Sequence, residues 1–422
     1  MVSRNLPEWL EYIERIHPKM IALGLDRVMR VKERLGVSFA GPIITVAGTN
    51  GKGSTCAMLE SILRSGGYRV GLYSSPHLLA YNERVRLNGT AVGDERLCRA
   101  FEQVEAARGE VALTYFEFGT LAAWLIFASE PLDALVLEVG MGGRLDAVNA
   151  FDTDCAIVTG VDIDHTEYLG STREAIGAEK AGIFRRGKPA IVSDLAAPSS
   201  VLERAAAIGA DLRLAGRDFG WSALGEHWSC WNRDSRVDGL AFPALRGAAQ
   251  LQNAAASVAA LDALRALLPV GPQAVSGGLA SVALPARFQV LPGRPAVVLD
   301  VAHNPQAAAV LAHNLSEMGF FRDTYAVLGM LRDKDIAAVS RALAGRVSAW
   351  YAVSLDGPRG ASAAAVAQAI RSAGAGGEVI ACDSPRAAYA IARNRAGDDA
   401  RIVVFGSFYT VADVLAAGSA RS

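Results

Sequence analysis

The sequence predicts an α/β protein in which helices alternate with buried parallel strands. Short apolar runs bounded by helical stretches recur along the chain, 42 of the 422 residues are glycines, and the alternation starts again near residue 295. A strand that is covered on both faces is apolar along its whole length, so this pattern favours parallel sheets flanked by helices over an all-β fold.

The first block of alternation follows a helical region at residues 7–35. A helix at 54–67 comes directly after the first predicted strand and ends at a pair of glycines. The predicted strands are residues 42–48, 69–74, 134–140, 155–161 and 189–193. Together they predict a parallel sheet with helices on both faces.

The second block predicts a smaller, Rossmann-like α/β unit of about 130 residues, within the usual size of a domain. Its predicted strands are residues 295–302, 324–330, 348–355, 378–382 and 401–407. The join is expected near residues 284–295, where Pro and Gly cluster. Residues 221–236 read as a hairpin or loop to which no role can be assigned.

The composition excludes several classes of protein. The net charge is −1 and there is no basic run, so we expect no nucleic-acid partner. The five cysteines are scattered without a CxxC pair, which predicts reduced thiols and a cytoplasmic location. No apolar run approaches the ~18 residues of a membrane span, and the N-terminal residues lack the apolar segment of a signal peptide.

The run IITVAGTNGKGSTCAML at residues 43–59 predicts a phosphate-binding loop between a strand and a helix. Backbone N–H groups and the helix N-terminus would surround an anionic phosphate, and Lys52 would reach the β- and γ-phosphates. Gly53 stands where the usual pattern has Ser or Thr, so Ser54 or Thr55 would face Mg²⁺ instead. The alternative is a Gly-rich turn followed by an ordinary Ser/Thr helix cap.

Two further residues are candidate metal ligands. Glu138 ends a predicted strand, and His165 follows the next one, in the run VDIDHTEYLG. Ligands bind at the carboxyl ends of strands in open parallel sheets, which places both side chains on the ligand side. Asp162 and Asp164 could orient the imidazole. The alternatives are a glutamate that faces solvent and a structural or exposed histidine.

Lys180 lies on a predicted helix among Ala and Ile residues. Burial lowers the pKa of a lysine because it disfavours the charged form, and a neutral amine can react with CO₂. The resulting carbamate would be a good ligand for a hard cation such as Mg²⁺. The alternative is a solvated lysine on a helix surface.

The displaced hydroxyl makes GTNGKGST similar to the ATP loop of the Mur ligase superfamily, whose members join a carboxylate to an amine through an acyl phosphate. Over nearly the whole chain, the sequence resembles the family of bacterial bifunctional dihydrofolate synthase/folylpolyglutamate synthases. The motifs that carry this resemblance are GTNGKGST (48–55), YSSPHLLAYNERVRLNG (73–89), LTYFEFGTLAA (113–123), LEVGMGGRLDAVN (137–149), DHTEYLG (164–170), EKAGIF (179–184), LPARFQ (284–289), DVAHNP (300–305) and GSFYTVADV (406–414).

The resemblance implies a catalytic set of Lys52, Glu138, His165 and Lys180. It implies that one or two Mg²⁺ ions are held by Ser75, Glu138, His165 and a CO₂-derived carbamate on Lys180. ATP would be bound by Thr49, Asn50, Gly51, Lys52, Gly53, Ser54, Asn253, Arg287 and Asp300. It further implies an ATP-binding domain over residues 1–287 and a glutamate-ligase domain over residues 288–422, with ATP clamped between them.

The resemblance also implies two groups of substrate contacts. The pterin of the acceptor would meet Thr114, Tyr115, Phe116, Glu117, Leu145, Asp146 and Ala147. Aromatic rings supply flat apolar area, and carboxylates accept hydrogen bonds from the amino-pyrimidine edge. The alternative for the aromatic residues is plain core packing. From topology alone, His303 and Ser407 would face the incoming glutamate.

The implied activity is ATP-dependent addition of L-glutamate to 7,8-dihydropteroate and of further glutamates to reduced folates. We expect a monomer with small-molecule substrates and no membrane partner. A cell-wall precursor ligase is disfavoured because only 47 residues precede Gly48, too few for a nucleotide-sugar domain. A folylpolyglutamate synthase without the first activity and a P-loop nucleotide switch remain alternatives.

Overall fold

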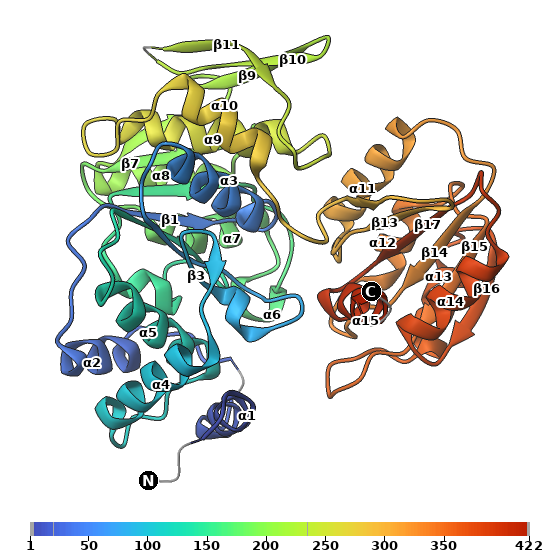
Figure 1. Ribbon diagram of the computed structural model, residues 1–422, viewed down its shortest axis with the longest axis horizontal. Coiled ribbons are helices and arrows are strands. Elements are labelled where there is room, and N and C mark those ends of the chain that lie inside the picture. The colour runs from blue at the N-terminus through green and yellow to red at the C-terminus, as the bar shows by residue number, and fades with distance from the viewer. Residues whose placement is uncertain (1–3, 20, 234, 420–422) are drawn as a thin grey trace. The chain divides into compact units, whose positions relative to one another are not determined.

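The computed structural model describes residues 4–19, 21–233 and 235–419. The chain divides into two compact units, Met1–Ala244 with Leu251–Val282 and Leu245–Gln250 with Ala283–Ser422. Helices and strands alternate in both (Figure 1), which confirms the predicted α/β class. The predicted assignment of ATP binding to residues 1–287 and glutamate ligation to residues 288–422 stays a prediction.

The first unit is built on an eight-stranded sheet. In spatial order its strands are β4 (Thr90–Ala91), β3 (Val85–Leu87), β2 (Val70–Tyr73), β5 (Ala134–Glu138), β1 (Ile43–Ala47), β6 (Cys155–Val158), β7 (Pro189–Val192) and β8 (Asp211–Leu214). Strands β2 to β8 in this order are parallel, and β3 and β4 extend one edge in antiparallel register. The predicted strands are all present.

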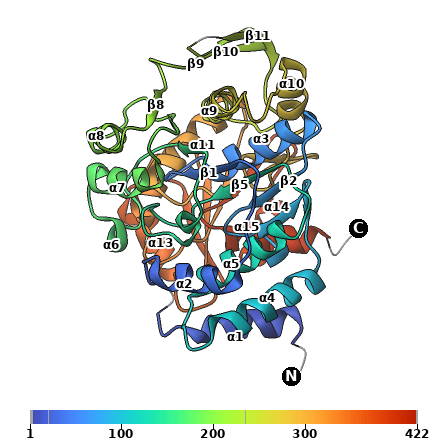
Figure 2. The same cartoon turned by 90° about the vertical axis from the view of Figure 1, so that its left-hand side faces the viewer.

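Helices cover both faces of this sheet, as Figures 1 and 2 show. On one face α3 packs against α10 and the central strands, with α9 beside them. The other face carries α5 with α1, α2 and α4, and also α6, α7 and α8 toward β7 and β8. The bounds are α1 (Leu6–Ile16), α2 (Asp26–Leu35), α3 (Lys52–Ser65), α4 (Asp94–Arg108), α5 (Tyr115–Ala128), α6 (Thr166–Leu169), α7 (Arg173–Lys180), α8 (Ser199–Ile208), α9 (Gln250–Ala263) and α10 (Pro272–Ser281).

Short 3₁₀ turns complete the unit at η1 (Tyr81–Arg84), η2 (Ala147–Ala150) and η3 (Ala181–Ile183). The prediction of one helical region over residues 7–35 is wrong in its middle, because α1 ends at Ile16 and α2 begins at Asp26. Pro18 explains the break, since a proline disfavours helical backbone in the residue before it, here His17.

The segment at 221–236 belongs to a small separate antiparallel sheet. Strands β9 (Gly220–Leu224), β10 (His227–Trp231) and β11 (Arg236–Ala241) pair in chain order. Trp228 is fully buried and donates its indole N–H to the Ala241 carbonyl at 2.9 Å. The predicted hairpin is therefore confirmed, and its tryptophan packs within the fold.

The second unit is a six-stranded sheet in the order β12 (Gln289–Leu291), β13 (Ala296–Leu299), β17 (Arg401–Phe405), β14 (Thr324–Leu328), β15 (Ala349–Val353) and β16 (Glu378–Cys382). All neighbours are parallel except β12, which pairs antiparallel with β13 at the edge. The five predicted strands are present, and β12 is an additional one.

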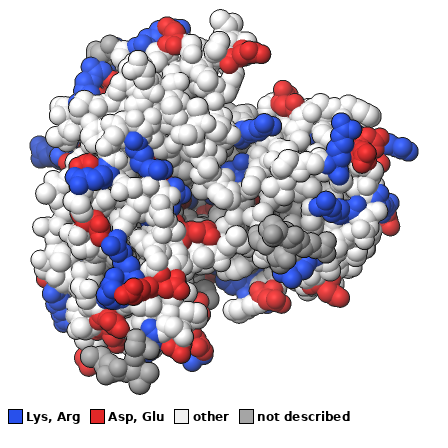
Figure 3. All heavy atoms as spheres, viewed as in Figure 1, with Lys and Arg blue, Asp and Glu red and all other residues white. Residues whose placement is uncertain are grey.

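Five helices pack on this second sheet: α11 (Pro305–Glu317), α12 (Ile336–Ala342), α13 (Ala363–Ser372), α14 (Pro385–Arg395) and α15 (Phe408–Ser419). Helices α11 to α13 contribute Leu311, Val339 and Ile370 to a core with Trp350 and Phe405. On the face drawn in Figure 3, acidic and basic side chains are interspersed over each unit. Within the described part of the chain, no helix is both long and apolar enough to cross a membrane.

Candidate active site

The predicted site segments of the first unit converge because they follow adjacent parallel strands. Strands β2, β5, β1 and β6 are neighbours in that order. Their carboxyl ends lead into residues 74–79, 139–146, 48–51 and 159–165. All four segments therefore lie at one edge of the sheet, where an open α/β sheet binds its ligands.

The phosphate loop joins β1 to α3 through two glycines that no other residue could replace without strain. Gly48 has φ +152° and Gly51 has φ +92°. A Cβ on Gly48 would lie 1.8 Å from Oγ1 of Thr159, and one on Gly51 would lie 2.6 Å from Oδ1 of Asn253. The second distance also places the predicted ATP ligand Asn253, on α9, directly beside the loop.

The helix that follows the loop begins without a side-chain cap. Its N-cap is Gly51, which rules out the alternative of an ordinary Ser/Thr cap. Lys52 donates from Nζ to the carbonyls of Gly48 at 3.0 Å and Thr49 at 3.4 Å, so it folds back over the loop. The backbone N–H groups of the first turn are the donors that favour an anion at a helix N-terminus.

The loop is anchored to the neighbouring strand end. Thr49 donates from its backbone N–H to Gly160 at 2.7 Å and from Oγ1 to the Asp162 carbonyl at 3.0 Å. Thr159 donates from Oγ1 to the Asn50 carbonyl at 2.6 Å. These bonds fix the segment that carries His165 against the phosphate loop.

Glu138 is the last residue of β5 and is 3% exposed, so the alternative of a solvent-facing glutamate is wrong. Its Oε2 accepts the backbone N–H of Ser75 at 3.1 Å. Its strand partner in β1 is Val46, two residues before the loop glycine. The two predicted metal ligands on β5 and after β2 are thus in direct contact.

His165 takes positive φ (51°) as it leads into α6. Its backbone N–H donates to Oδ1 of Asp164 at 2.8 Å, and its Nε2 lies 3.9 Å from Oδ2 of the same carboxylate. The Asp164 carboxylate is therefore near the imidazole, and its role in orienting the ring stays a prediction. The side chain is 32% exposed, so it is accessible to a ligand.

Lys180 ends α7 and is 3% exposed, so the alternative of a solvated lysine is wrong. Burial, and then the nearby charge of Lys52, lower the pKa of Lys180 to about 7, while Asp164 and Asp146 oppose the shift. These mutual effects place Lys52, Lys180, Asp164 and Asp146 in one cluster. At neutral pH a large share of the Lys180 amine is unprotonated.

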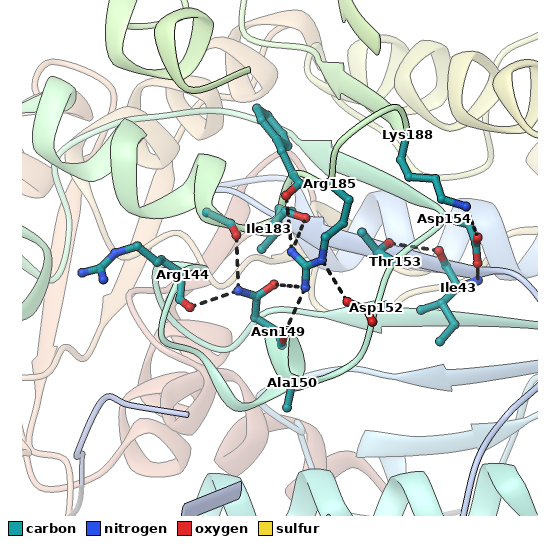
Figure 4. A network of polar contacts seen from close by, with 12 residues as sticks. Ile43, Arg144, Asn149, Ala150, Asp152, Thr153, Asp154, Ile183, Arg185 and Lys188 are labelled. Atoms are coloured by element: carbon teal, nitrogen blue, oxygen red, sulfur yellow. Dashed lines mark hydrogen bonds and ion pairs between the residues drawn. The ribbon is translucent and has the colours of Figure 1, made fainter. Parts of the chain in front are cut away.

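A network of polar contacts ties the loop after β5 to the segment after Lys180 (Figure 4). Asn149 donates from Nδ2 to the carbonyls of Arg144 at 3.0 Å and Gly182 at 3.2 Å. Arg185 donates from Nη2 to Oδ1 of Asn149 at 2.9 Å and from Nε to Asp152 at 3.1 Å. These bonds therefore fix residues 144–152 against residues 182–185, directly after Lys180.

The first predicted acceptor segment forms the start of α5. Thr114 is its N-cap and Glu117 completes a capping box, with hydrogen bonds of 2.8 and 3.2 Å between them. Glu117 is also in an ion pair with Arg27, at 2.9 Å between Oε1 and Nη2. Oε2 of Glu117 accepts hydrogen bonds from Thr114 and Arg27, whereas the buried Oε1 accepts none from the residues that the structure describes.

The aromatic residues of this segment have different settings. The Phe116 ring lies against Gly140, whose Cβ would approach it to 2.6 Å, and it is 5.8 Å from the Tyr73 ring. Tyr115 is partly buried and packs edge-on to Tyr81 at 5.9 Å. The Phe116 ring therefore borders the loop that follows β5, and both rings also pack against the buried core of the first unit.

The second predicted acceptor segment is Leu145, Asp146 and Ala147. Asp146 caps η2, where Oδ1 accepts the Val148 N–H at 3.0 Å and Oδ2 accepts that of Met141 at 2.8 Å. Burial raises the pKa of Asp146 to about 7. The Leu145 carbonyl accepts the Gly24 N–H at 3.1 Å, so the stretch before α2 lies beside this segment.

The predicted residues of the second unit also converge, at the carboxyl ends of adjacent β13 and β17. Asp300 accepts the backbone N–H groups of Phe288 at 2.8 Å and Ala302 at 2.7 Å, on either side of it in space. Arg287 lies over the Phe408 ring at 5.4 Å. Burial raises the pKa of Asp300, and the charge of Arg287 opposes this.

His303 and Ser407 lie at the same edge of this second sheet. His303 Nδ1 is 2.9 Å from the Val301 carbonyl, which can only accept, so Nδ1 carries the proton. Ser407 is buried and its Oγ accepts the Thr410 N–H at 3.1 Å, at the start of α15. This arrangement brings together all four predicted residues of the second unit.

Sequence reasoning missed the partners that hold these residues. Arg27 pairs with Glu117 across 90 positions of sequence, which no local pattern indicates. The capping box of Thr114 and Glu117 does have a local signal, Thr-x-x-Glu before an apolar run. The hydrogen bond between Arg185 and Asn149 (Figure 4) has no such signal, because the residue types alone predict only an exposed arginine and an exposed asparagine.

Two domain families match this chain. Residues 46–212 match the Mur ligase middle domain, and residues 286–408 match the glutamate ligase domain of Mur ligases. The dihydrofolate synthase/folylpolyglutamate synthase of Escherichia coli K12 is 44% identical over 99% of this chain and 96% of its own length.

Solved structures agree with this sequence similarity. Escherichia coli FolC in complex with DHPP and ADP superposes with a TM-score of 0.95 at 43% identity, covering 99% of both chains. A bifunctional folylpolyglutamate synthase/dihydrofolate synthase with Mn, AMPPNP and L-glutamate bound gives 0.92 at 44% identity, covering 99% of this chain and 98% of its own. With the predicted site segments gathered at one edge of each sheet, the chain belongs to the dihydrofolate synthase/folylpolyglutamate synthase family of ATP-dependent Mur ligases.

Proposed function

We propose that this chain uses ATP to join L-glutamate to 7,8-dihydropteroate and then to add further glutamates to reduced folates. The observation that carries the proposal is that Lys52, Glu138 and His165 follow or end adjacent strands, while Lys180 of α7 lies close enough for the charges of Lys52 and Asp164 to shift its pKa. The family supports it, since relatives with both activities in their names match almost the whole chain.

In this proposal ATP is held by Thr49 to Ser54 and by Asn253. The contact between Gly51 and Asn253 supports their joint role, because both border the space above the helix N-terminus. Arg287 and Asp300 of the second unit complete the proposed set of ATP contacts. His303 and Ser407 of that unit are proposed to face L-glutamate.

The residues present fit a divalent cation of the Mg²⁺ type. Among the described residues no three His, Cys, Asp or Glu side chains are grouped as a complete metal site. Glu138 and His165 supply two such donors, and Ser75 a hydroxyl, which leaves room for a carbamate on Lys180 and for phosphate oxygens. One or two bound Mg²⁺ ions would neutralise charge on the transferred phosphoryl group.

The carbamate is supported by the setting of Lys180. The amine nitrogen attacks the carbon of CO₂, an N–C bond forms, and a proton passes from the nitrogen to water. The product carries a negative charge, which is favoured beside Lys52 and replaces a buried ammonium. The reaction needs a neutral amine, and the lowered pKa supplies it.

The acceptor is proposed to lie along Thr114 to Glu117 and Leu145 to Ala147. Asp146 and the rings of Tyr115 and Phe116 would bind the pterin edge and face. The chain's own residues would align the acceptor carboxylate with the γ-phosphate of ATP, and Lys52 would neutralise the charge there. The carboxylate then becomes an acyl phosphate, and the amine of L-glutamate displaces inorganic phosphate from it.

The test is a phosphate-release assay on the purified protein with ATP and Mg²⁺, in which L-glutamate and the acceptor are varied. Release that needs both L-glutamate and either 7,8-dihydropteroate or tetrahydrofolate supports the proposal. Release with L-glutamate and tetrahydrofolate, but not with L-glutamate and 7,8-dihydropteroate, would identify a folylpolyglutamate synthase without the first activity. Release without any acceptor would identify a nucleotide switch. The monomeric state and the cytoplasmic location stay predictions.

A further inference from the structure

Arg84, the last residue of η1, is a partly buried cation held in a fixed position beside the predicted acceptor segment. Its Nε donates to Nδ1 of His77 at 2.9 Å. Its guanidinium carbon lies 5.3 Å from the centre of the Tyr81 ring and 5.5 Å from that of Tyr115. Two aromatic rings and one imidazole therefore fix the side chain before any ligand arrives.

The two terminal nitrogens of Arg84 are left for another group. Among the residues that the structure describes, none accepts a hydrogen bond from Nη1 or Nη2 or forms an ion pair with this guanidinium. The adjacent carboxylate, Glu83, is already used, because it accepts the backbone N–H groups of residues 78, 79 and 80 at 2.7 to 2.8 Å. The N–H groups on Nη1 and Nη2 form a planar fork, which matches the two oxygens of a carboxylate.

His77 holds this arrangement without competing for charge. Its Nδ1 accepts from Arg84, so the proton of a neutral imidazole lies on Nε2. Burial, and then the charge of Arg84, lower the pKa of His77 to about 4. At neutral pH the imidazole is uncharged, and Arg84 is the cation of this pair.

The backbone places Arg84 between the predicted metal ligands and the predicted pterin contacts. The Arg84 carbonyl accepts the N–H of Ser74 at 2.9 Å, and the next residue, Ser75, donates to Glu138. On the other side, the guanidinium lies over Tyr115 at the start of α5. A ligand that runs from the pterin segment toward the metal ligands would pass near this fork.

The two acceptors of the proposed function differ in charge at such a point. Dihydropteroate has a single carboxylate, the one that reacts. A reduced folate reacts through the γ-carboxylate of its glutamate and carries an additional α-carboxylate a short aliphatic chain away. Only the second acceptor therefore brings a spare anion close to the reacting group.

We infer that Arg84 binds the α-carboxylate of the terminal glutamate of a reduced folate, and so determines use of the folate acceptor over dihydropteroate. This inference rests on the proposed function. It makes Arg84 a specificity residue for chain extension. His77 is then a positioning residue that acts through Arg84.

The experiment compares Arg84→Gln and Arg84→Lys with the unchanged protein, using kcat/KM for tetrahydrofolate and for 7,8-dihydropteroate in parallel. Arg84→Gln loses a charge-assisted hydrogen bond to the folate. The kcat/KM for tetrahydrofolate divided by that for 7,8-dihydropteroate should therefore fall by roughly tenfold to a hundredfold, mainly because KM for tetrahydrofolate rises. Arg84→Lys keeps the charge but lacks the planar guanidinium, so the same ratio should fall less in this variant. Arg99→Gln, on the exposed face of α4, is the matched control and should leave the ratio unchanged.

A modified acceptor separates binding from folding defects. The unchanged protein should use a tetrahydrofolate with an amidated α-carboxylate poorly, and Arg84→Gln should cause no further loss with it. An equal loss for both natural acceptors in Arg84→Gln would overturn the inference and leave Arg84 as a support of the loop. Failure of the proposed function looks different, because the unchanged protein would then use neither acceptor.

Discussion

The backbone N–H of Ser75 donates to Oε2 of Glu138 at 3.1 Å, across two adjacent strands of the first sheet. This bond joins the loop after β2 to the end of β5, and β5 in turn pairs with the strand of the phosphate loop. Glu138 is buried at this junction. A bound cation would stabilise a buried carboxylate at this position.

Replacing Glu138 by Gln should weaken the dependence on magnesium. The amide keeps the shape and still accepts the Ser75 N–H, but it removes the charge that attracts the cation. We expect the half-saturating Mg²⁺ concentration to rise on the order of tenfold or more. A magnesium titration of ATP turnover measures it, with Glu130→Gln, two residues beyond α5, as the control. An unaltered titration would mean that Glu138 is not a ligand.

Lys180→Ala should abolish most turnover and retain ATP binding. The substitution removes the amine that would carry the carbamate, and the loss of a preorganised charge at the site costs about a hundredfold or more in rate. A short carboxylic acid added to the assay should restore part of the activity, because it can occupy the vacated space. Lys188→Ala, which breaks an exposed ion pair with Asp154, is the control. Unchanged turnover in Lys180→Ala would show that the activity does not require a carbamate on Lys180.

Activity should depend on CO₂ and on pH through Lys180. Its pKa of about 7 means that the amine is mostly neutral at about pH 8 and mostly protonated at about pH 6. In CO₂-depleted buffer, addition of CO₂ at a fixed dissolved concentration should restore activity well at the higher pH and poorly at the lower one. Lys180→Ala should show no such response. Equal recovery at both values would contradict the requirement for a neutral amine.

The same pKa predicts how stability changes with pH. The pKa of Lys180 is lowered in the folded protein, so the unfolded chain binds more protons between about pH 7 and the ordinary lysine value. The contribution of this group to stability therefore rises as pH increases through that window. Lys180→Met should remove the contribution, which thermal unfolding in CO₂-free buffer at several pH values would detect.

Gly51→Ala should lower both stability and nucleotide binding. The residue has φ +92°, which costs about 1–2 kcal/mol for an L-residue, and its Cβ would press on the Asn253 amide. Gly67 has φ +87° and open space around its Cβ position, so Gly67→Ala isolates the backbone cost. Calorimetric titration with ADP should show weaker binding for Gly51→Ala only. Equal ADP affinity in the two variants would show that nucleotide binding does not depend on the present position of the Asn253 amide.

Much of this architecture follows from local sequence. Strands such as Ile43–Ala47 and Arg401–Phe405 are buried throughout and mostly apolar because helices cover both faces, and this makes them visible in the sequence. Edge strands are different: Asp211–Leu214 alternates charged and apolar residues at partial exposure, and it was not predicted. Strand Gln289–Leu291 is short and partly exposed, so it too lacks an apolar signal.

The site was predictable where chemistry is confined to a short segment. Gly48, Gly51 and Lys52 lie within five consecutive residues, and their spacing alone indicates phosphate binding. The setting of Lys180 required the fold, because its low pKa arises from burial and from Lys52, far away in sequence. The fork of Arg84 also depends on contacts with Tyr115 and His77 that only the folded chain creates.

The most direct test of the central claim follows the oxygen atoms of the acceptor. The protein is supplied with ATP, Mg²⁺, L-glutamate and dihydropteroate whose carboxylate carries heavy oxygen, and the released phosphate is analysed by mass spectrometry. If the carboxylate is activated as an acyl phosphate, the phosphate should contain a heavy oxygen from the acceptor for each new amide bond. Unlabelled phosphate alongside product would contradict the account.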